Sequence, residues 1–366
     1  MTSPGYQILD PGPDLRPMPD MTWHPSVVDY DSHAAYRPLA AQADLRTRLS
    51  ATAIFLAGMA KLLLKRAIRY EMIPYDLRAD RSVSGRLRFI GAAMRNTVAG
   101  NMRKRHASAA TGGGEARMDR HGVMVVAVPP DQVALLEAAS AAEFEALAAR
   151  RGTSTGPRRF EESRGQASRA GSRVLFNRIE ALLQDSGVMA ASDAYLGRPA
   201  RLIDVNPQIN DVTDSFWRDI FPDIGADELP ATAYCHRDAS GGDLKAIIYL
   251  SDVDERNGPF SYVLGSNRMR ISRLDDLICE ANDSNGLGAT GPEARKRFAA
   301  LPKRLRQKGA FGNDLTPDSP ISAGINAGLW AIQAPKGSIV LFDTKGIHRG
   351  GMVVEGERRV ITCVIG

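Results

Sequence analysis

The chain has 366 residues, of which 43% are hydrophobic and 24% charged, and it carries a formal net charge of +5. This composition is typical of a globular protein and excludes a disordered chain, while the length allows one or two domains. Its three cysteines, Cys235, Cys279 and Cys363, are too scattered for a disulfide framework or a paired-cysteine metal site, which indicates a reducing compartment.

Seven prolines lie within the first 40 residues, and they predict an extended, irregular arm because proline fixes φ and removes a backbone donor. The first residues lack the basic and apolar regions of a secretory signal. No apolar run reaches the roughly 20 residues of a membrane span. The sequence therefore predicts a cytoplasmic protein.

Residues 45–105 form a strongly basic segment, with 14 Lys/Arg against 3 Asp/Glu. This segment carries +11, so the rest of the chain carries −6, the difference between +5 and +11. Apolar residues recur at helical spacing from Leu49 to Ala67 and predict an amphipathic helix. Such a helix can make peripheral membrane contact or pack on the remaining protein, and both interpretations stay open. Few aromatic residues and no known DNA-binding motif argue against a nucleic-acid partner.

Small residues at 107–115 predict a flexible break. We therefore divide the chain into a Pro-rich arm with a basic helical extension, 1–114, and a second domain, 115–366. The second domain opens with a polar turn and a short apolar strand, 118–126. Helices at 132–151 and 174–186 follow. From residue 201 short strands alternate with turns, at 201–210, 245–250, 260–264, 337–342 and 358–365.

A helical insertion, 272–334, interrupts these strands, and its centre at 292–308 holds seven Lys/Arg and one acidic residue. A basic helix between core strands favours an anionic substrate. The other interpretation is a helix with a solvated basic face, and the sequence does not decide between them.

His236 and Asp238 are the residues that point most clearly to chemistry. Side chains alternate faces along a strand, so residues two apart point the same way and can reach one metal ion. A third donor, His348, follows far downstream. Two imidazoles and one carboxylate form the ligand set of non-haem Fe(II) oxygenases, which leaves other coordination positions open.

Further motifs accompany these three residues. An aspartate-rich turn ends in Asn257-Gly258-Pro259, Gly265-Ser266-Asn267 follows it, and Gly337-Ser338 opens the strand before His348. With these motifs, residues 115–366 resemble the phytanoyl-CoA dioxygenase-like family of Fe(II)/2-oxoglutarate-dependent oxygenases. The resemblance implies a mainly β fold with flanking helices, built on a double-stranded β-helix (jelly-roll, cupin-like) core behind the helical N-terminal extension. It also implies His236, Asp238 and His348 as ligands of Fe(2+), with 2-oxoglutarate and O2 as cosubstrates.

The resemblance also implies an arginine on the last strand that binds the distal carboxylate of 2-oxoglutarate. Arg359 has the family spacing from His348, and Arg358 is the adjacent alternative on the opposite strand face. The resemblance places an asparagine contact to 2-oxoglutarate on a strand comparable to that of Asn210. Gln208 and Tyr234 are candidates for substrate contacts.

The activity that the resemblance implies is a dioxygenase that hydroxylates or otherwise oxidises an unactivated C–H bond of a small molecule. Anionic, carrier-linked and lipid-linked molecules fit the basic insertion. Asp238 argues against the halogenating relatives, in which glycine or alanine stands at that position. The alternative is a catalytically silent metal-binding jelly-roll that acts as a binding or regulatory module. The sequence does not indicate an oligomeric state.

Overall fold

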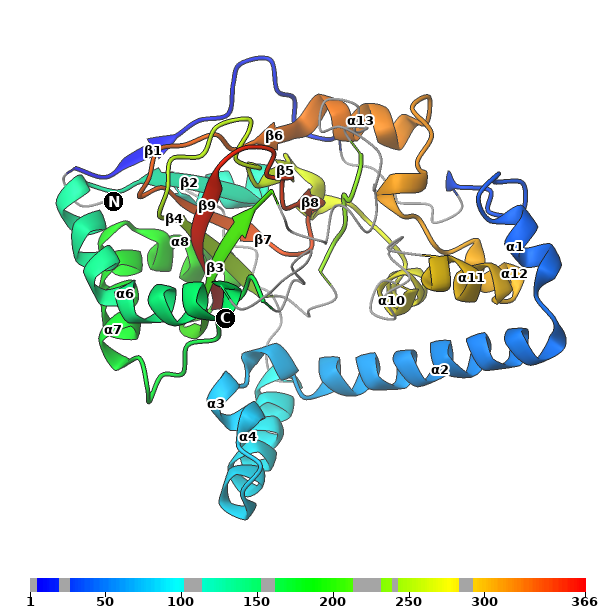
Figure 1. The fold of residues 1–366 in the computed structure, drawn as a ribbon, viewed down its shortest axis with the longest axis horizontal. Coiled ribbons are helices and arrows are strands. Elements are labelled where there is room, and N and C mark those ends of the chain that lie inside the picture. The colour runs from blue at the N-terminus through cyan, green and yellow to red at the C-terminus, as the bar shows by residue number, and fades with distance from the viewer. Residues whose placement is uncertain are drawn as a thin grey trace.

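The computed structural model describes residues 5–19, 27–101, 114–152, 162–212, 232–238, 243–282 and 292–366. Two antiparallel sheets lie face to face at its centre (Figure 1). Within the described residues the larger sheet has six strands in the order β1-β2-β7-β4-β9-β3, and the smaller has three in the order β6-β5-β8. The strands of the larger sheet are β1 (Gln7–Leu9), β2 (Val123–Ala127), β3 (Leu202–Asp211), β4 (Leu244–Tyr249), β7 (Ile339–Asp343) and β9 (Glu357–Ile365). Those of the smaller sheet are β5 (Ser261–Val263), β6 (Leu329–Ala331) and β8 (His348–Arg349).

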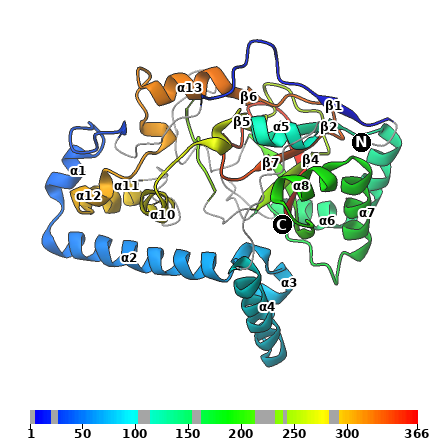
Figure 2. The same ribbon diagram turned by 180° about the vertical axis from the view of Figure 1, so that it is seen from behind.

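Helices cover the outer face of the larger sheet (Figure 2). They are α5 (Gly114–His121), α6 (Pro130–Gly152), α7 (Arg173–Asp185) and α8 (Val188–Leu196). Alternate strand residues such as Ala246, Ile248 and Ile361 are fully buried against the apolar faces of these helices. Burial of each large aliphatic side chain of this kind contributes about 1.5–3 kcal/mol. The intervening residues point to the inner face, toward the smaller sheet.

A second core joins the N-terminal arm to the insertion, although the two are far apart in sequence. The arm contributes α1 (Arg37–Gln42) and α2 (Leu45–Ala67). The insertion contributes α10 (Arg273–Asn282), α11 (Pro292–Ala300), α12 (Lys303–Arg306), η6 (Gly312–Asp314) and α13 (Pro320–Gly328). The ring centroids of Tyr30 and Phe298 are 4.7 Å apart. Tyr36 donates a 2.6 Å hydrogen bond to Asp314, and Tyr30 donates one of 3.2 Å to the same carboxylate.

Three short elements and one longer helix complete the described chain: η2 (Tyr70–Met72), α3 (Tyr75–Ala79), η4 (Ser266–Arg268) and α4 (Val83–Asn101). An ion pair between Arg78 and Asp204 fastens α3 to β3. The same carboxylate accepts a 2.8 Å hydrogen bond from the backbone N–H of Tyr75. The N-terminal extension is thus tied to the larger sheet as well as to the insertion.

The antiparallel sheet with flanking helices agrees with the sequence-based prediction, and the six predicted strands correspond to β2, β3, β4, β5, β7 and β9. One local prediction is wrong. Residues 114–121, expected as the end of a flexible break and a polar turn, form α5, which packs on α8 and β2. The chain turns only afterwards, at Gly122, whose φ of +75° lies in the left-handed region. The remainder of the predicted break, 107–113, lies outside the described residues.

Candidate metal centre

Strand pairing brings His348 to His236. The two residues form an antiparallel bridge, in which each backbone N–H donates to the other's carbonyl oxygen at 3.0 and 2.9 Å. The pairing continues at Asp238, whose N–H donates to the carbonyl oxygen of Thr344 at 2.9 Å. Residues directly opposite in an antiparallel pair project to the same side. The imidazole centroids of His236 and His348 are accordingly 4.6 Å apart.

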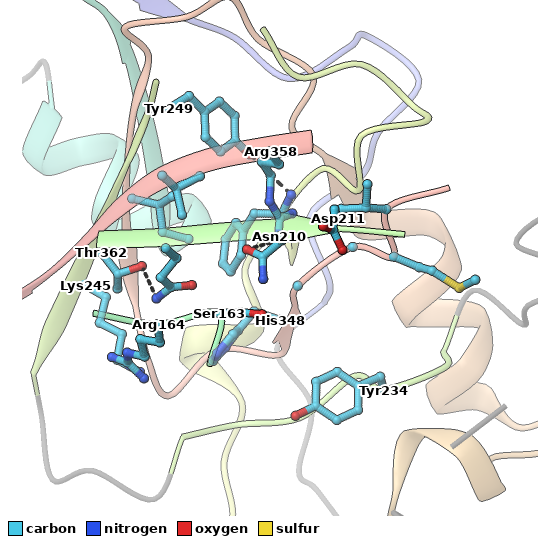
Figure 3. Close-up of a pocket in the computed structure, with 18 of the residues that line it drawn as sticks. Ser163, Arg164, Asn210, Asp211, Tyr234, Lys245, Tyr249, His348, Arg358 and Thr362 are labelled. Atoms are coloured by element: carbon cyan, nitrogen blue, oxygen red, sulfur yellow. Dashed lines mark hydrogen bonds between the residues drawn. The ribbon is translucent and has the colours of Figure 1, made fainter. Parts of the chain in front are cut away.

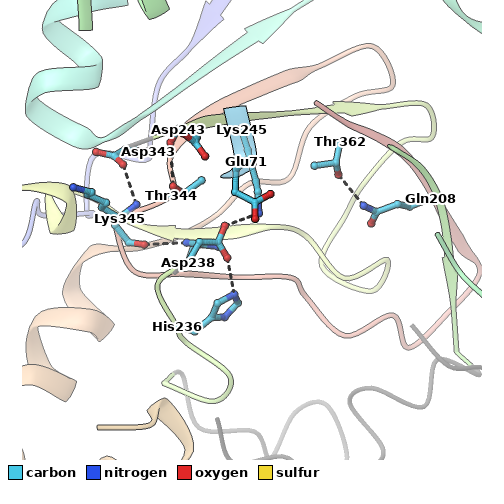
Figure 4. Close-up of polar contacts among 12 residues, drawn as sticks. Glu71, Gln208, His236, Asp238, Asp243, Lys245, Asp343, Thr344, Lys345 and Thr362 are labelled. Carbon is cyan, nitrogen blue, oxygen red and sulfur yellow. Dashed lines mark hydrogen bonds and ion pairs between the residues drawn. The ribbon is translucent and has the colours of Figure 1, made fainter. Parts of the chain in front are cut away.

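Three side chains converge here: Figure 4 shows His236 beside Asp238, and Figure 3 shows His348 at the cavity wall. The Nε2 atom of His236 lies 3.8 Å from Oδ1 of Asp238, and the Nε2 atom of His348 lies 3.7 Å from Oδ2. One ligand atom from each of the three residues lies within 4.8 Å of the others. Among the described residues, this is the group of histidine, cysteine and acidic side chains that can hold a metal ion.

Backbone carbonyl oxygens set the tautomer of both imidazoles. Nδ1 of His236 lies 2.9 Å from the carbonyl oxygen of Tyr234, and Nδ1 of His348 lies 2.9 Å from that of Gly346. A carbonyl oxygen only accepts, so each Nδ1 carries the proton and each Nε2 presents a lone pair. This outer hydrogen bond is the arrangement that orients histidine ligands in metal sites.

The charges of the site also suit a cation. Burial lowers the pKa of His348 to about 3, so this imidazole stays neutral and able to coordinate. Burial opposes the charge of Asp238, but the pKa of this carboxyl is held below its usual range, chiefly by the charge of Lys245. The neutral imidazole of His348, a second imidazole from His236 and one carboxylate therefore fit a divalent metal ion of the Fe(II) type.

The lowered pKa of His348 predicts a pH dependence for the metal-free protein. Below the ordinary histidine pKa, His348 binds a proton in the unfolded chain but not in the folded protein. The free energy of unfolding therefore falls as the pH decreases from about 6.5 toward 3. Between about pH 6.5 and pH 5 this costs on the order of 1–2 kcal/mol. Urea unfolding with a chelator present should show this loss for the wild type and a flatter profile for His348→Gln. If the free energy of unfolding depended equally on pH in the two proteins, the assignment of a neutral buried His348 would be contradicted.

Lys245 is a site residue that the sequence-based interpretation missed. It lies on β4, and its Nζ donates a 2.5 Å hydrogen bond to Oδ2 of Asp238 (Figure 4). A carboxylate that binds a metal through one oxygen is commonly held by a donor on the other. The available signal was a lysine inside an otherwise apolar strand, Leu244–Tyr249, at a position with the parity of the inner face.

We expect Lys245→Met to weaken Fe(II) binding by about 10- to 100-fold, because Asp238 loses the donor that orients it. Lys296→Met is the matched control, since it also removes one lysine–carboxylate pair, with Glu293 at 2.8 Å, from the protein surface. Anaerobic Fe(II) titration of both variants measures the difference. Equal affinities for the two variants would show that Lys245 does not support the metal ligand.

The three candidate ligands line a cavity of about 490 Å³. This volume is within the usual range for small-molecule sites. Its walls come from the inner face of the larger sheet, from the loop of residues 232–238 that carries His236 and Asp238 (the metal loop), and from the segment after β8 (Figure 3). The lining residues are Ser163, Arg164, Gln208, Asn210, Asp211, Val212, Tyr234, His236, Asp238, Lys245, Ile247, Tyr249, Phe260, Phe342, His348, Gly350, Gly351, Met352, Val353, Arg358, Val360 and Thr362.

Arg358, rather than Arg359, faces this cavity, so the placement expected for Arg359 is wrong. Arg358 is 9% exposed and donates to Oδ1 of Asn210 at 3.3 Å. The Arg359 side chain is 51% exposed and donates to Glu357 at 2.6 Å. The register explains this, because β9 pairs Arg358 with Asn210 and alternation sends Arg359 to the other face. Thr362 was the available signal, since it is a polar strand residue with the parity of Arg358.

The other candidates from the sequence, Asn210, Gln208 and Tyr234, line the cavity. Asn210 and Gln208 project from β3 into the cavity, and Gln208 donates a 3.0 Å hydrogen bond to Thr362. Tyr234 also lines the cavity, with its ring centroid 4.8 Å from that of His236. Its φ of 56° is left-handed, which costs a non-glycine residue free energy. The strained residue is the one whose carbonyl oxygen orients His236.

The insertion supports the metal loop from behind, a role that the sequence did not reveal. Arg237, between the two ligands, donates to Oδ1 of Asp276 at 3.1 Å, while Arg66 of α2 lies 3.1 Å from Oδ2 of the same residue. Gly312 packs so closely that a Cβ atom there would lie 2.3 Å from the carbonyl oxygen of Thr232. The insertion thus contacts the loop directly, and Arg66 of the N-terminal extension binds the same aspartate of the insertion as Arg237 does.

Several basic residues of the insertion pair with acidic side chains of the arm or of the insertion itself. Lys303 and Arg306 both pair with Asp31, at 2.7 and 2.6 Å, and Lys308 pairs with Asp275 at 2.8 Å. Within the described part of the chain, none of the seven lysines and arginines of 292–308 lines the cavity. Lys303 and Arg306 thus join α12 to the N-terminal arm.

No protein-family model and no curated protein matches this chain. Solved structures with partial similarity include AviO1 from Streptomyces viridochromogenes Tue57, 16% identical with a TM-score of 0.38, over 71% of this chain and 96% of that one. EctD from S. alaskensis, solved with 2-oxoglutarate and 5-hydroxyectoine, is 15% identical with a TM-score of 0.40, over 72% and 78%. SnoN, a non-heme alpha ketoglutarate dependent epimerase from nogalamycin biosynthesis, is 14% identical with a TM-score of 0.35, over 69% and 80%. The functional assignment rests on the site itself.

Proposed function

We propose that this protein is an Fe(II)- and 2-oxoglutarate-dependent oxygenase of the phytanoyl-CoA dioxygenase-like type. The observation that carries the proposal is the convergence of two Nε2 lone pairs and one ionised carboxylate, from His236, His348 and Asp238, at the wall of a cavity. This ligand set leaves coordination positions open for a cosubstrate and O2.

Each cavity wall has a role in this proposal. His236, Asp238 and His348 would hold Fe(II), and Arg358 with Asn210 would bind the distal carboxylate of 2-oxoglutarate. A guanidinium matches a carboxylate in shape and charge, and burial strengthens the pair. When bound, iron and 2-oxoglutarate supply the activation of O2 and the oxidation of a C–H bond. Phe260 and Phe342, which are buried beside His348 with ring centroids at 5.7 and 5.0 Å, exclude water from this wall.

We propose hydroxylation of a small molecule as the reaction, since Asp238 occupies the position that a halide would need. Space for a substrate lies at Gly350, where an added Cβ would meet no atom within 4 Å. Tyr234 and Gln208 line the same cavity and would contact the substrate. The mass of the product distinguishes the outcomes, because hydroxylation adds one oxygen atom whereas ring closure or desaturation removes two hydrogens.

Succinate formation tests the proposed function. Purified protein with Fe(II), 2-oxoglutarate and O2 should convert 2-oxoglutarate to succinate, faster when a substrate is present. Omission of iron or O2 should abolish the reaction. A protein that binds one Fe(II) tightly but forms no succinate with any member of a broad panel of small molecules would be a metal-binding module rather than an oxygenase.

A further inference from the structure

Helix α2 has two apolar faces, only one of which is buried. Ala51, Phe55 and Leu62 pack into the core shared with α10 and α11. On the opposite side of the helix a leucine stripe faces solvent, with residues 49–72% exposed. The stripe consists of Leu45, Leu49, Leu56, Leu63 and Leu64. The helical periodicity in the sequence therefore marks the outward face of α2 rather than its packed face.

Helix α4 shows the same arrangement. Val83, Leu87, Ile90 and Met94 follow one another at helical spacing and are 51–78% exposed. Ala92 and Ala93, on the other side, are buried beside Ile73. Thr97 of α4 donates a 3.1 Å hydrogen bond to the carbonyl oxygen of Ala67 at the end of α2. The two helices thus meet, and both lie along one side of the protein, with α4 projecting from it (Figure 1).

The charges of the two helices have a single sign. Neither contains an aspartate or a glutamate. Their basic residues are Arg46, Arg48, Lys61, Lys65 and Arg66 in α2, and Arg86, Arg88 and Arg95 in α4. An exposed apolar stripe beside basic residues is the pattern of a helix that lies in the interface of an anionic membrane.

We propose that the exposed faces of α2 and α4 dock this protein on a membrane surface that contains anionic lipid. A second copy of the chain fits less well, because two such faces would bring like charges together. Nucleic acid fits less well too, since the most exposed side chains are leucines, which gain nothing from phosphate.

The helix lies on the membrane in this proposal and does not cross it. Among the described residues, α2 is the one helix long and apolar enough to span a bilayer by length and composition, and 17% of its most apolar window is buried. Its inner face, however, belongs to the core of the folded protein. Arg66 also pairs with Asp276 and Glu280 of α10. Spanning would separate these groups, whereas docking leaves them in place.

Vesicle flotation of the full chain tests the proposal. The probes are vesicles of phosphatidylcholine alone and of phosphatidylcholine mixed with phosphatidylglycerol. One variant combines Leu49→Gln, Leu56→Gln and Leu63→Gln, which alters the stripe and leaves the packed face intact. A second combines Arg46→Glu, Lys61→Glu and Arg86→Glu. The matched control, Leu135→Gln with Val174→Gln, changes exposed apolar residues on α6 and α7.

We expect the wild type and the control to float with the anionic vesicles, and added salt to weaken this binding. Both test variants should bind at least about ten-fold more weakly. Unchanged binding of either variant would overturn the proposal, as would a wild type that binds no anionic vesicle at low salt. A dimer that the leucine variant abolishes would assign the face to a second copy instead. Succinate formation by the variants in solution should equal that of the wild type, which separates this test from that of the proposed function.

Discussion

An Asp238→Ala variant should bind Fe(II) at least about 100-fold more weakly than the wild type and form no succinate above background. Loss of an outer support of a metal ligand already costs about 10- to 100-fold, and loss of the ligand itself costs more. Asp238 supplies the site's negative charge and lies 3.8 and 3.7 Å from the two imidazole Nε2 atoms. Anaerobic Fe(II) titration and a succinate assay measure the two effects.

Asp318→Ala is the control for this experiment. Asp318 is an exposed aspartate of the insertion, so its removal changes the net charge equally without touching the cavity. The variant should retain the iron affinity and the turnover of the wild type. If Asp238→Ala kept its iron affinity while remaining folded, the metal would have to bind elsewhere.

Arg358→Met and Arg359→Met form the second decisive comparison, because the two residues are chain neighbours on opposite strand faces. We expect Arg358→Met to raise the KM for 2-oxoglutarate by about 10- to 100-fold, since a hydrogen bond to a charged group contributes about 1.5–3 kcal/mol. Arg359→Met should change it less than two- or three-fold, because its side chain is exposed and pairs with Glu357.

Iron affinity distinguishes cosubstrate binding from a general disturbance of the site. Both arginine variants should bind Fe(II) like the wild type, because neither residue is among the three candidate ligands. A larger KM effect at Arg359 than at Arg358 would reverse the assignment of the cosubstrate arginine and support the family spacing instead.

The part of the site that was predictable from the sequence is the pair of ligands two residues apart, His236 and Asp238. The spacing of His236 and Asp238 predicted that both side chains reach one site, and they do so in the structure, although the two residues lie in a loop with an isolated β-bridge rather than in a strand. The approach of His348 depends on its backbone bridge to His236, a long-range pairing that no local pattern encodes. The resemblance to a family was needed to select this histidine.

The wrong placement of Arg359 and the omission of Lys245 also follow from contacts between segments that are far apart in the sequence. Spacing from His348 favoured Arg359, but the register of β9 against β3 decides which arginine points inward. Lys245 acquires its role only when β4 approaches the metal loop. The periodicity of α2 was visible in the sequence, yet whether its leucines face a core or the solvent depends on which side meets α10 and α11.

Binding of 2-oxoglutarate with and without iron, measured anaerobically by calorimetry, tests the central claim most directly. The claim is that His236, Asp238 and His348 share one cavity with Arg358 and form a single site for Fe(II) and its cosubstrate. The account predicts that one 2-oxoglutarate binds per iron-loaded chain, and that the metal-free protein binds it at least about ten-fold more weakly. Equal affinity in both states, or no binding to the iron-loaded protein, would contradict it.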